Sequence, residues 1–201
     1  MTSRDFVRHA YCSALLALCK KKNLNKITVN DVVNEVGTAR QTFYNYFRDI
    51  NDLICYIPAA FYAESHNPPY TRDGIKASLY YTLENKEYFS QVPYHEGQNS
   101  FRETYLRWMK EGCYALALKD ITDEVEYLQK RLLIDGYIYA SVELYYDWCK
   151  EGMKWPPELL LDAVFEMRPD ILRDYDTLDF CGESYVCRED EAYPFEFAYS
   201  D

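Results

Sequence analysis

Residues 27–54, ITVNDVVNEVGTARQTFYNYFRDINDLI, decide the fold. Thr28 is a typical N-cap residue, and Asp31 three positions later gives a variant of the capping box that begins a helix. Three valines then form an apolar side, and Gly37 can adopt the positive φ that ends a helix. A second short helix follows over residues 39–47. Two short helices joined by a tight turn predict a helix-turn-helix.

The helix predicted over residues 39–47 has two unlike faces. At 100° per residue, Phe43 and Phe47 lie about 40° apart and define an apolar side. Gln41 and Asn45 point the opposite way. Gln and Asn can each bond adenine bidentately, and an arginine such as Arg40 can bond guanine in the major groove. Taken alone, this outer face is also typical of the solvated side of an ordinary short helix. The preceding helix, the turn and a basic surplus favour DNA binding.

Helical periodicity continues on both sides of this stretch, so the predicted fold class is all-α. A helix is predicted over residues 4–22, and a linking helix over 49–66 begins at a cap formed by Asp49 or Asn51. Pro58 lies inside the linking helix and makes a bend there plausible, because proline lacks an N–H. Four further helices are expected over residues 73–85, 99–118, 122–150 and 157–168.

The net charge of −11 is unusual for a DNA-binding protein, but the charge is unevenly distributed. Residues 1–57 hold eight Lys and Arg against five Asp and Glu, a net charge of +3. The remaining 144 residues hold 14 against 28, a net charge of −14. A basic head on an acidic body keeps DNA at one end of the molecule.

Several function classes lack support. No GxSxG, Walker A, HExxH or GxGxxG motif occurs, so we expect no enzyme and no catalytic residues. The seven cysteines form no CxxC pair, and His66 and His95 have no cluster at ligand spacing. We therefore expect no metal site and no cofactor. Neither a secretory signal nor an 18-residue apolar run is present, which favours a cytoplasmic protein without membrane contact.

The quoted stretch resembles the DNA-binding signature of TetR-family regulators. Gly37, the run from Thr42 to Phe47, and the pair Asp52-Leu53 carry the resemblance without a gap. The resemblance implies a homodimer whose two recognition helices enter successive major grooves of a palindromic operator. It also implies an all-α body that binds a ligand. The C-terminal pattern from Tyr139 to Glu158 is similar to a TetR subgroup that includes an activator of a dihydroxyacetone-kinase operon.

The resemblance assigns roles to individual residues. Base-reading or groove positions correspond to Arg40, Gln41, Thr42 and Asn45. Contacts to the DNA backbone are expected from Lys26, Thr28, Tyr44, Tyr46 and Arg48, whose cations and hydroxyls suit phosphate oxygens.

Three residues depart from the family pattern. Thr38 follows the turn glycine where an aliphatic residue is usual, and Ala39 stands where Ser or Thr often caps the helix. Ile50 replaces a lysine that commonly grips phosphate at the start of the fourth helix. The last change weakens the expected grip on the DNA backbone, which Arg48 is expected to compensate.

The body is rich in tyrosine, with 21 in the whole chain. Aromatic side chains can line a mostly apolar ligand pocket with a few polar tips. The candidates for such a pocket are Tyr80, Tyr105, Trp108, Tyr114 and Tyr137. Packing in the core or in a dimer interface is the alternative for each of them. The helices over 122–150 and 157–168 are apolar enough to form the dimer.

These observations predict a sequence-specific DNA-binding regulator of TetR type that acts as a ligand-responsive repressor. The expected partners are double-stranded palindromic operator DNA, a second copy of the chain and an unidentified small-molecule effector. The alternative is a protein-interaction module on a TetR scaffold that has lost ligand or DNA function. The expected domains are a helix-turn-helix over residues 1–50, a ligand-binding and dimerisation body over 51–170, and an acidic aromatic tail over 171–201.

Overall fold

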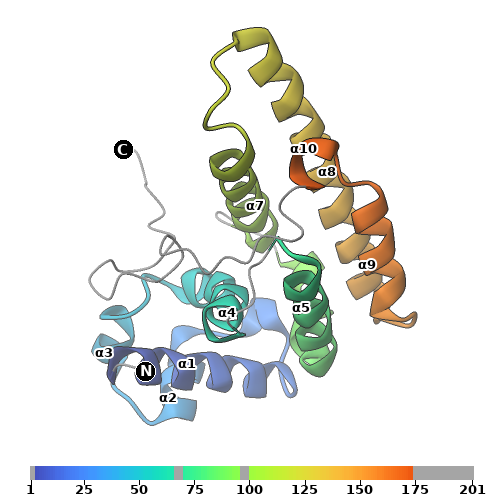
Figure 1. The fold of residues 1–201 in the computed structure, drawn as a ribbon. Coiled ribbons are helices and arrows are strands. Elements are labelled where there is room, and N and C mark those ends of the chain that lie inside the picture. Colours follow the sequence, from blue (N-terminus) through green and yellow to red (C-terminus); the bar gives the residue numbers. More distant parts are fainter. Residues whose placement is uncertain (1–2, 66–69, 96–99, 174–201) are drawn as a thin grey trace.

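The computed structural model of the chain describes residues 3–65, 70–95 and 100–173, and these are helical with no strand among them (Figure 1). The prediction of an all-α fold is therefore confirmed. The α-helices are α1 (Ser3–Cys19), α2 (Val29–Val36), α3 (Arg40–Tyr44), α4 (Ile50–Ser65), α5 (Arg72–Glu84), α6 (Lys86–Phe89), α7 (Phe101–Ala117), α8 (Glu124–Lys150), α9 (Pro157–Glu166) and α10 (Asp170–Arg173). Two 3₁₀ turns, η1 (Leu24–Lys26) and η2 (Val92–Tyr94), complete the described elements.

The helix-turn-helix forms as its end signals predict. The Thr28 hydroxyl accepts from the Asp31 N–H, and the Asp31 carboxylate accepts from the Thr28 N–H in return. Gly37 ends α2 with φ 77°. The helix α3 is shorter than the predicted 39–47 mainly at its end, because the N–H groups of Asn45 and Tyr46 bond carbonyls three residues back instead of four. Its last turn still continues toward the predicted end, since the N–H groups of Tyr46 and Phe47 both reach the Phe43 carbonyl.

The linking helix α4 joins this head to the body. Asp49 caps it by accepting from the Asp52 N–H at 2.8 Å, which decides between the two predicted caps. Pro58 lies inside the helix, as the sequence requires. The predicted domain boundary at residue 50 falls on the first residue of α4.

Hydrogen bonds to the segment that contains α6 and η2 hold the head against the body. The side chain of Gln91 accepts from the Leu24 N–H at 2.7 Å and donates to the Cys19 carbonyl at 3.2 Å. Asn25 donates to the Tyr94 carbonyl at 2.7 Å. These contacts fix the end of α1 and all of η1 against the body.

His95 ties the start of α4 to the start of α7. Its Nδ1 accepts from the Phe101 N–H at 3.2 Å, so its Nε2 carries the proton and donates to the Asn51 side chain at 3.1 Å. Burial lowers the pKa of His95, which favours the neutral ring that this arrangement requires. His95 therefore has a structural role in the joint between head and body.

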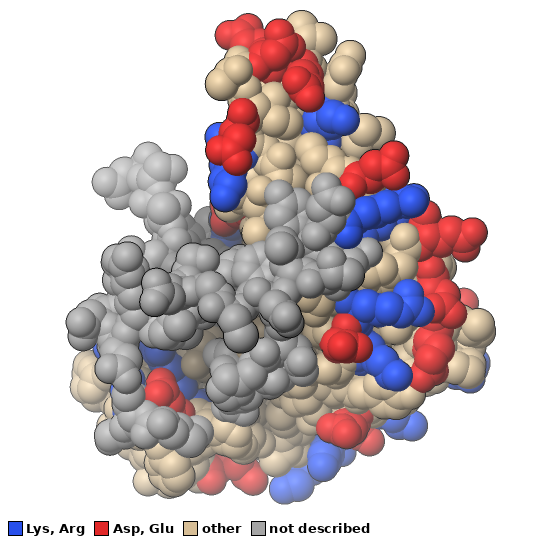
Figure 2. Space-filling view, in the orientation of Figure 1, with Lys and Arg blue, Asp and Glu red and all other residues tan. Residues whose placement is uncertain are grey.

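The body consists of α5, α7, α8 and α9, and the antiparallel pair α7 and α8 extends away from the head (Figure 1). The end where α7 and α8 meet is acidic (Figure 2). Asp120, Asp123, Glu124 and Glu126 are exposed there. Among the described residues, no helix is long and apolar enough to cross a membrane. His66 and residues 174–201 of the predicted tail lie outside the described ranges.

Candidate nucleic-acid interface

The inner side of α3 rests on aromatic rings. Tyr11 of α1 is completely buried and meets Phe43 edge to face, with ring centroids 5.3 Å apart, and Phe47 at 6.0 Å. The Tyr11 hydroxyl lies 2.8 Å from the Thr38 hydroxyl in the turn before α3. The departure at Thr38 thus has a physical reason, because its hydroxyl partners a buried phenol that an aliphatic residue would leave unpaired.

The outer side of α3 faces solvent with hydrogen-bonding groups. Arg40, Gln41, Tyr44 and Asn45 are exposed, while Thr42 is half-buried at the edge. The Arg40 guanidinium donates to the Tyr44 hydroxyl at 2.9 Å and lies 5.6 Å from the centroid of its ring. The structure therefore places the four base-reading candidates and Tyr44 on or beside one accessible face.

The remaining backbone-contact candidates lie outside this face, and several are already engaged. Lys26 in η1 is exposed, and Tyr46 is half-buried against Tyr11 at 6.2 Å between ring centroids. The Arg48 guanidinium pairs with the Asp52 carboxylate at 3.6 Å. An arginine held by a carboxylate offers DNA less net charge than a free one, so Arg48 compensates only in part for the missing lysine at Ile50.

A carboxylate occupies the start of α2. Oδ2 of Asp31 accepts from the Lys22 ammonium at 2.6 Å and from the hydroxyl and N–H of Thr28 at 2.7 and 2.8 Å. These hydrogen bonds, that of Lys22 foremost, lower the pKa of Asp31 to about 2. The proton of the Thr28 hydroxyl is therefore already donated, and a DNA phosphate at Thr28 would compete with Asp31 for it.

This arrangement suits the reading of duplex DNA. A helix with a buried aromatic side and an outer row of Arg, Gln, Thr and Asn matches the groups that bond base edges in the major groove. Within the described ranges, no group of three or more His, Cys, Asp or Glu could hold a metal ion.

The body contains a cavity of about 80 Å³ between α4, α5, α6, α7, α8 and α9. Tyr105 and Tyr137, two of the five pocket candidates, line it. Trp108 is not part of the lining, but its ring centroid lies 5.5 Å from that of Tyr62 and 5.6 Å from that of Tyr105, both of which line the cavity. Eight aromatic residues line the cavity: Phe61, Tyr62, Tyr81, Phe89, Phe101, Tyr105, Tyr137 and Tyr145.

The other two pocket candidates lie away from the cavity lining. Tyr80 is 42% exposed and its hydroxyl bonds Glu158 of α9. The Tyr114 hydroxyl bonds Asp135 of α8. The prediction that Tyr80 and Tyr114 line the pocket is therefore wrong. Each predicted helix has aromatic residues on more than one face, and helical periodicity does not tell which face meets the cavity.

The cavity lining holds no charged side chain. Its hydroxyl groups are mostly paired: Ser78 donates to the Ile75 carbonyl at 2.9 Å, and Thr82 lies 3.0 Å from the Tyr145 hydroxyl. The Ser141 hydroxyl is buried and has no hydrogen-bond partner among the described residues. A bound molecule can therefore meet one unpaired polar group in otherwise apolar surroundings.

Sequence reasoning missed the residues that join the head to this body. Gln91, Tyr88 and His95 make their contacts across long chain separations, which no local pattern encodes. One signal was available for Tyr88. Pro58 inside a helix leaves the carbonyl of Ile54 without its usual donor, and that carbonyl needs another partner.

Comparison with known proteins gives two kinds of match. A family model described as a transcriptional regulator C-terminal region matches residues 71–170. The fold is similar to the solved structure of dihydroxyacetone kinase operon activator DhaS, with a TM-score of 0.57 and 16% identity over 80% of this chain and 92% of that chain. At that identity the likeness shows the fold alone.

A second solved structure is NalD, the secondary repressor of the MexAB-OprM multidrug efflux pump in Pseudomonas aeruginosa. It gives a TM-score of 0.43 and 18% identity over 80% of this chain and 95% of that chain. No curated protein matches the chain.

The contact between Lys22 and Asp31 predicts a measurable titration. Asp31 should titrate at about 2 in an NMR experiment, and Lys22→Met should move its pKa toward 3.8, whereas Lys21→Met should not. A lowered carboxyl pKa contributes stability above the unfolded value, and this contribution is lost as the pH falls from 3.8 to about 2. Titration of Asp31 near 3.8 in the unaltered protein would refute the contact.

Proposed function

The chain belongs to the TetR family of transcriptional regulators, and from that premise we propose that it is a homodimeric, ligand-responsive repressor that binds a palindromic operator through α3. The observation that carries the proposal is the solvent-facing row of Arg40, Gln41 and Asn45 on a helix whose other side is buried. Repression is the simplest mode of action, because a dimer seated on its operator excludes other proteins from that DNA.

We assign the reading of the DNA sequence to the outer side of α3. Arg40 is pre-oriented by its hydrogen bond to Tyr44, which reduces the side-chain freedom lost on binding guanine. Gln41 and Asn45 are free to approach adenine edges. Lys26, Tyr44, Tyr46 and Arg48 contribute phosphate contacts around them. Thr28 contributes only if Asp31 yields its hydrogen bond.

We assign dimerisation to α8 and α9, which keep several large apolar side chains exposed in the single chain. Large apolar residues that stay exposed on these helices or at the end of α9 are Val125, Tyr127, Leu128, Leu132, Leu133, Tyr139, Leu144, Leu159 and Met167. Gly136 lies among those of α8, and a Cβ added there would meet nothing within 4 Å. A second copy can therefore approach α8 closely at Gly136 and bury this face. Dimerisation is typical of the family.

The ligand response falls to the aromatic cavity. Because no charged side chain lines it, a charged ligand would lose its hydration without compensation. We propose that the effector is an uncharged, largely apolar molecule with one hydrogen-bonding group that meets Ser141. At about 80 Å³ the cavity has room for roughly three water molecules. A ligand larger than that has to displace lining side chains, which couples binding to the packing of α4.

Because the body is acidic, the spacing between the two heads decides whether the dimer can bind its operator. The body repels DNA, so only the two basic heads can meet it, and half-sites one helical turn apart require heads roughly 34–36 Å apart. A ligand that favours another packing of the body would tilt α4 and change that spacing. Coupling of typically about 1–3 kcal/mol changes operator affinity by roughly five- to 150-fold.

Selection of binding sites from a random duplex pool, followed by affinity measurements on variants, tests DNA reading. Asn45→Ala and Arg40→Ala should each weaken binding to the selected operator by about 1–3 kcal/mol and relax the base preference at one position. Lys26→Ala should weaken binding to all sequences about equally, since a phosphate contact carries no sequence information. Lys119→Ala, a charge change in the body, is the matched control and should have no effect.

An unchanged affinity of Asn45→Ala for the selected operator would mean that α3 is oriented differently. Failure to enrich any sequence would favour the alternative, an interaction module on the same scaffold. Two features give that alternative its weight: Ile50 stands where a lysine is common, and Asp31 competes for the start of α2.

The dimer is tested by light scattering and by sedimentation at micromolar concentration. Leu132→Lys should raise the dimer dissociation constant by about 30-fold or more, which corresponds to about 2 kcal/mol for a central interface residue. Tyr127→Lys is the matched control, because residue 127 lies about 140° away around the same helix. A monomeric unaltered protein, or equal effects of both variants, would contradict the assignment of the dimer face.

The effector class is tested by thermal unfolding with small probes. Phenol and benzyl alcohol should raise the midpoint by about 5–10 °C at 100 times their dissociation constants, whereas benzoate and trimethylphenylammonium should not. Ser141→Leu should abolish the shift in a protein whose circular dichroism is unchanged, because leucine fills part of the cavity. Stabilisation by benzoate equal to that by phenol would overturn the charge argument, and no shift with any neutral probe would overturn the ligand site.

A further inference from the structure

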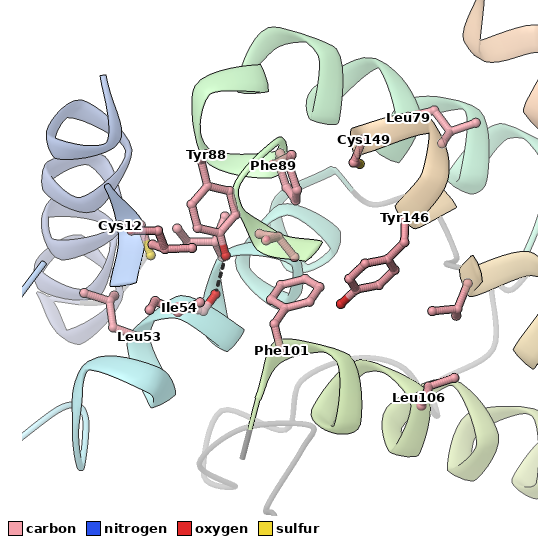
Figure 3. Close-up of a cluster of buried hydrophobic side chains, with 14 of the residues drawn as sticks. Cys12, Leu53, Ile54, Leu79, Tyr88, Phe89, Phe101, Leu106, Tyr146 and Cys149 are labelled. Atoms are coloured by element: carbon pink, nitrogen blue, oxygen red, sulfur yellow. Dashed lines mark hydrogen bonds between the residues drawn. The ribbon is translucent and has the colours of Figure 1, made fainter. Parts of the chain in front are cut away.

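The linking helix α4 contains a defect that a distant tyrosine repairs. Pro58 has no N–H, so the carbonyl of Ile54, four residues earlier, lacks its helical donor. The hydroxyl of Tyr88, on α6, donates to this carbonyl at 2.7 Å (Figure 3). Ile54 and Tyr88 are each 1% exposed, so water cannot take the place of the hydroxyl.

The chemistry of Tyr88 suits a permanent donor. Burial raises its pKa well above the usual value for tyrosine, so the hydroxyl stays protonated. Its ring packs edge to face on Phe89, with centroids 4.7 Å apart, which holds the hydroxyl in place. The bond to α4 is therefore as well fixed as a helical hydrogen bond, although it comes from another element.

The same short segment reaches the cavity on one side and the head on the other. Phe89, next to Tyr88, lines the cavity together with Pro58 itself. A few residues on, Gln91 holds the end of α1 and the start of η1. His95 then bonds Asn51 at the start of α4. Residues 86–95 thus contact the ligand cavity, the bend-prone point of α4 and the helix-turn-helix in succession.

We infer that Tyr88 is a positioning residue for operator binding: its hydrogen bond to the Ile54 carbonyl sets the direction of α4 at Pro58 and so the placement of the two heads in the dimer. This inference rests on the proposed function for its DNA readout. It differs from a purely structural role, because it requires the hydroxyl to control the spacing of the heads as well as the stability of the fold.

A double-mutant cycle separates the hydrogen bond from other effects. Tyr88→Phe removes only the hydroxyl, and Pro58→Ala returns an N–H that can bond the Ile54 carbonyl. Tyr88→Phe should lower the unfolding midpoint by about 4–8 °C in the unaltered chain, because a buried carbonyl loses its donor. In the Pro58→Ala background the same change should cost less than half as much. Equal losses in both backgrounds would overturn the proposed bond.

The positioning role is measured with a series of selected operators whose half-site spacing differs by one base pair. Tyr88→Phe should lower affinity for the preferred spacing by about fivefold or more and flatten the preference among spacings. Addition of Pro58→Ala should restore part of that preference. A folded Tyr88→Phe dimer with unchanged affinity and unchanged spacing preference would overturn the positioning role.

Tyr114→Phe is the matched control, because it removes another hydroxyl that is bonded within the body, to Asp135, and lies away from the cavity lining. It should lower the midpoint and leave the spacing preference intact. The unfolding midpoint and the spacing preference also distinguish failure of the proposed function from failure of the inference about Tyr88. If no duplex binds the unaltered protein, the proposed function fails, while the unfolding cycle still confirms or overturns the Tyr88 bond.

Discussion

The buried ring of Tyr11 is the contact on which the placement of α3 depends. A five-residue helix has too few internal hydrogen bonds to be stable alone, so its orientation must come from packing. Tyr11 fixes this orientation through two contacts. Its ring packs against Phe43 and Phe47, and its hydroxyl bonds the Thr38 hydroxyl in the preceding turn. With Phe43 and Phe47 fixed inward, the side chains of Arg40, Gln41, Tyr44 and Asn45 face solvent. The polar face of α3 is thus a consequence of what α1 buries.

The joint between head and body is of another kind. Besides apolar contacts, it includes hydrogen bonds between the side chains of Gln91, Asn25, His95 and Tyr88 and backbone or amide groups. Such contacts are directional and each contributes modestly, so together they can define one geometry without making it permanent. A rigid head on an adjustable joint is what a regulator needs if a ligand in the body is to change the spacing of its DNA contacts.

Much of the fold could be predicted from the sequence because its signals are local. The Thr28 and Asp31 capping box, the positive φ at Gly37 and the spacing of Phe43 and Phe47 all depend on neighbours within one or two turns. The cavity and the joint could not be predicted in the same way. Tyr80 and Tyr114 bond carboxylates of α9 and α8, while Tyr105 and Tyr137 line the cavity, and composition does not distinguish these pairs. Nor does the sequence of α4 reveal which donor bonds the Ile54 carbonyl that Pro58 leaves without a helical partner.

The central claim is that a basic head on an acidic body binds duplex DNA through phosphate contacts that position α3. The most direct measurement is the affinity of the full chain for its selected operator as a function of salt concentration. The two phosphate-contact cations of each head, Lys26 and Arg48, predict a slope of about −4 for log K against log salt, because each neutralised phosphate releases a counterion. A slope near zero, or binding that is undetectable at low salt, would contradict the account.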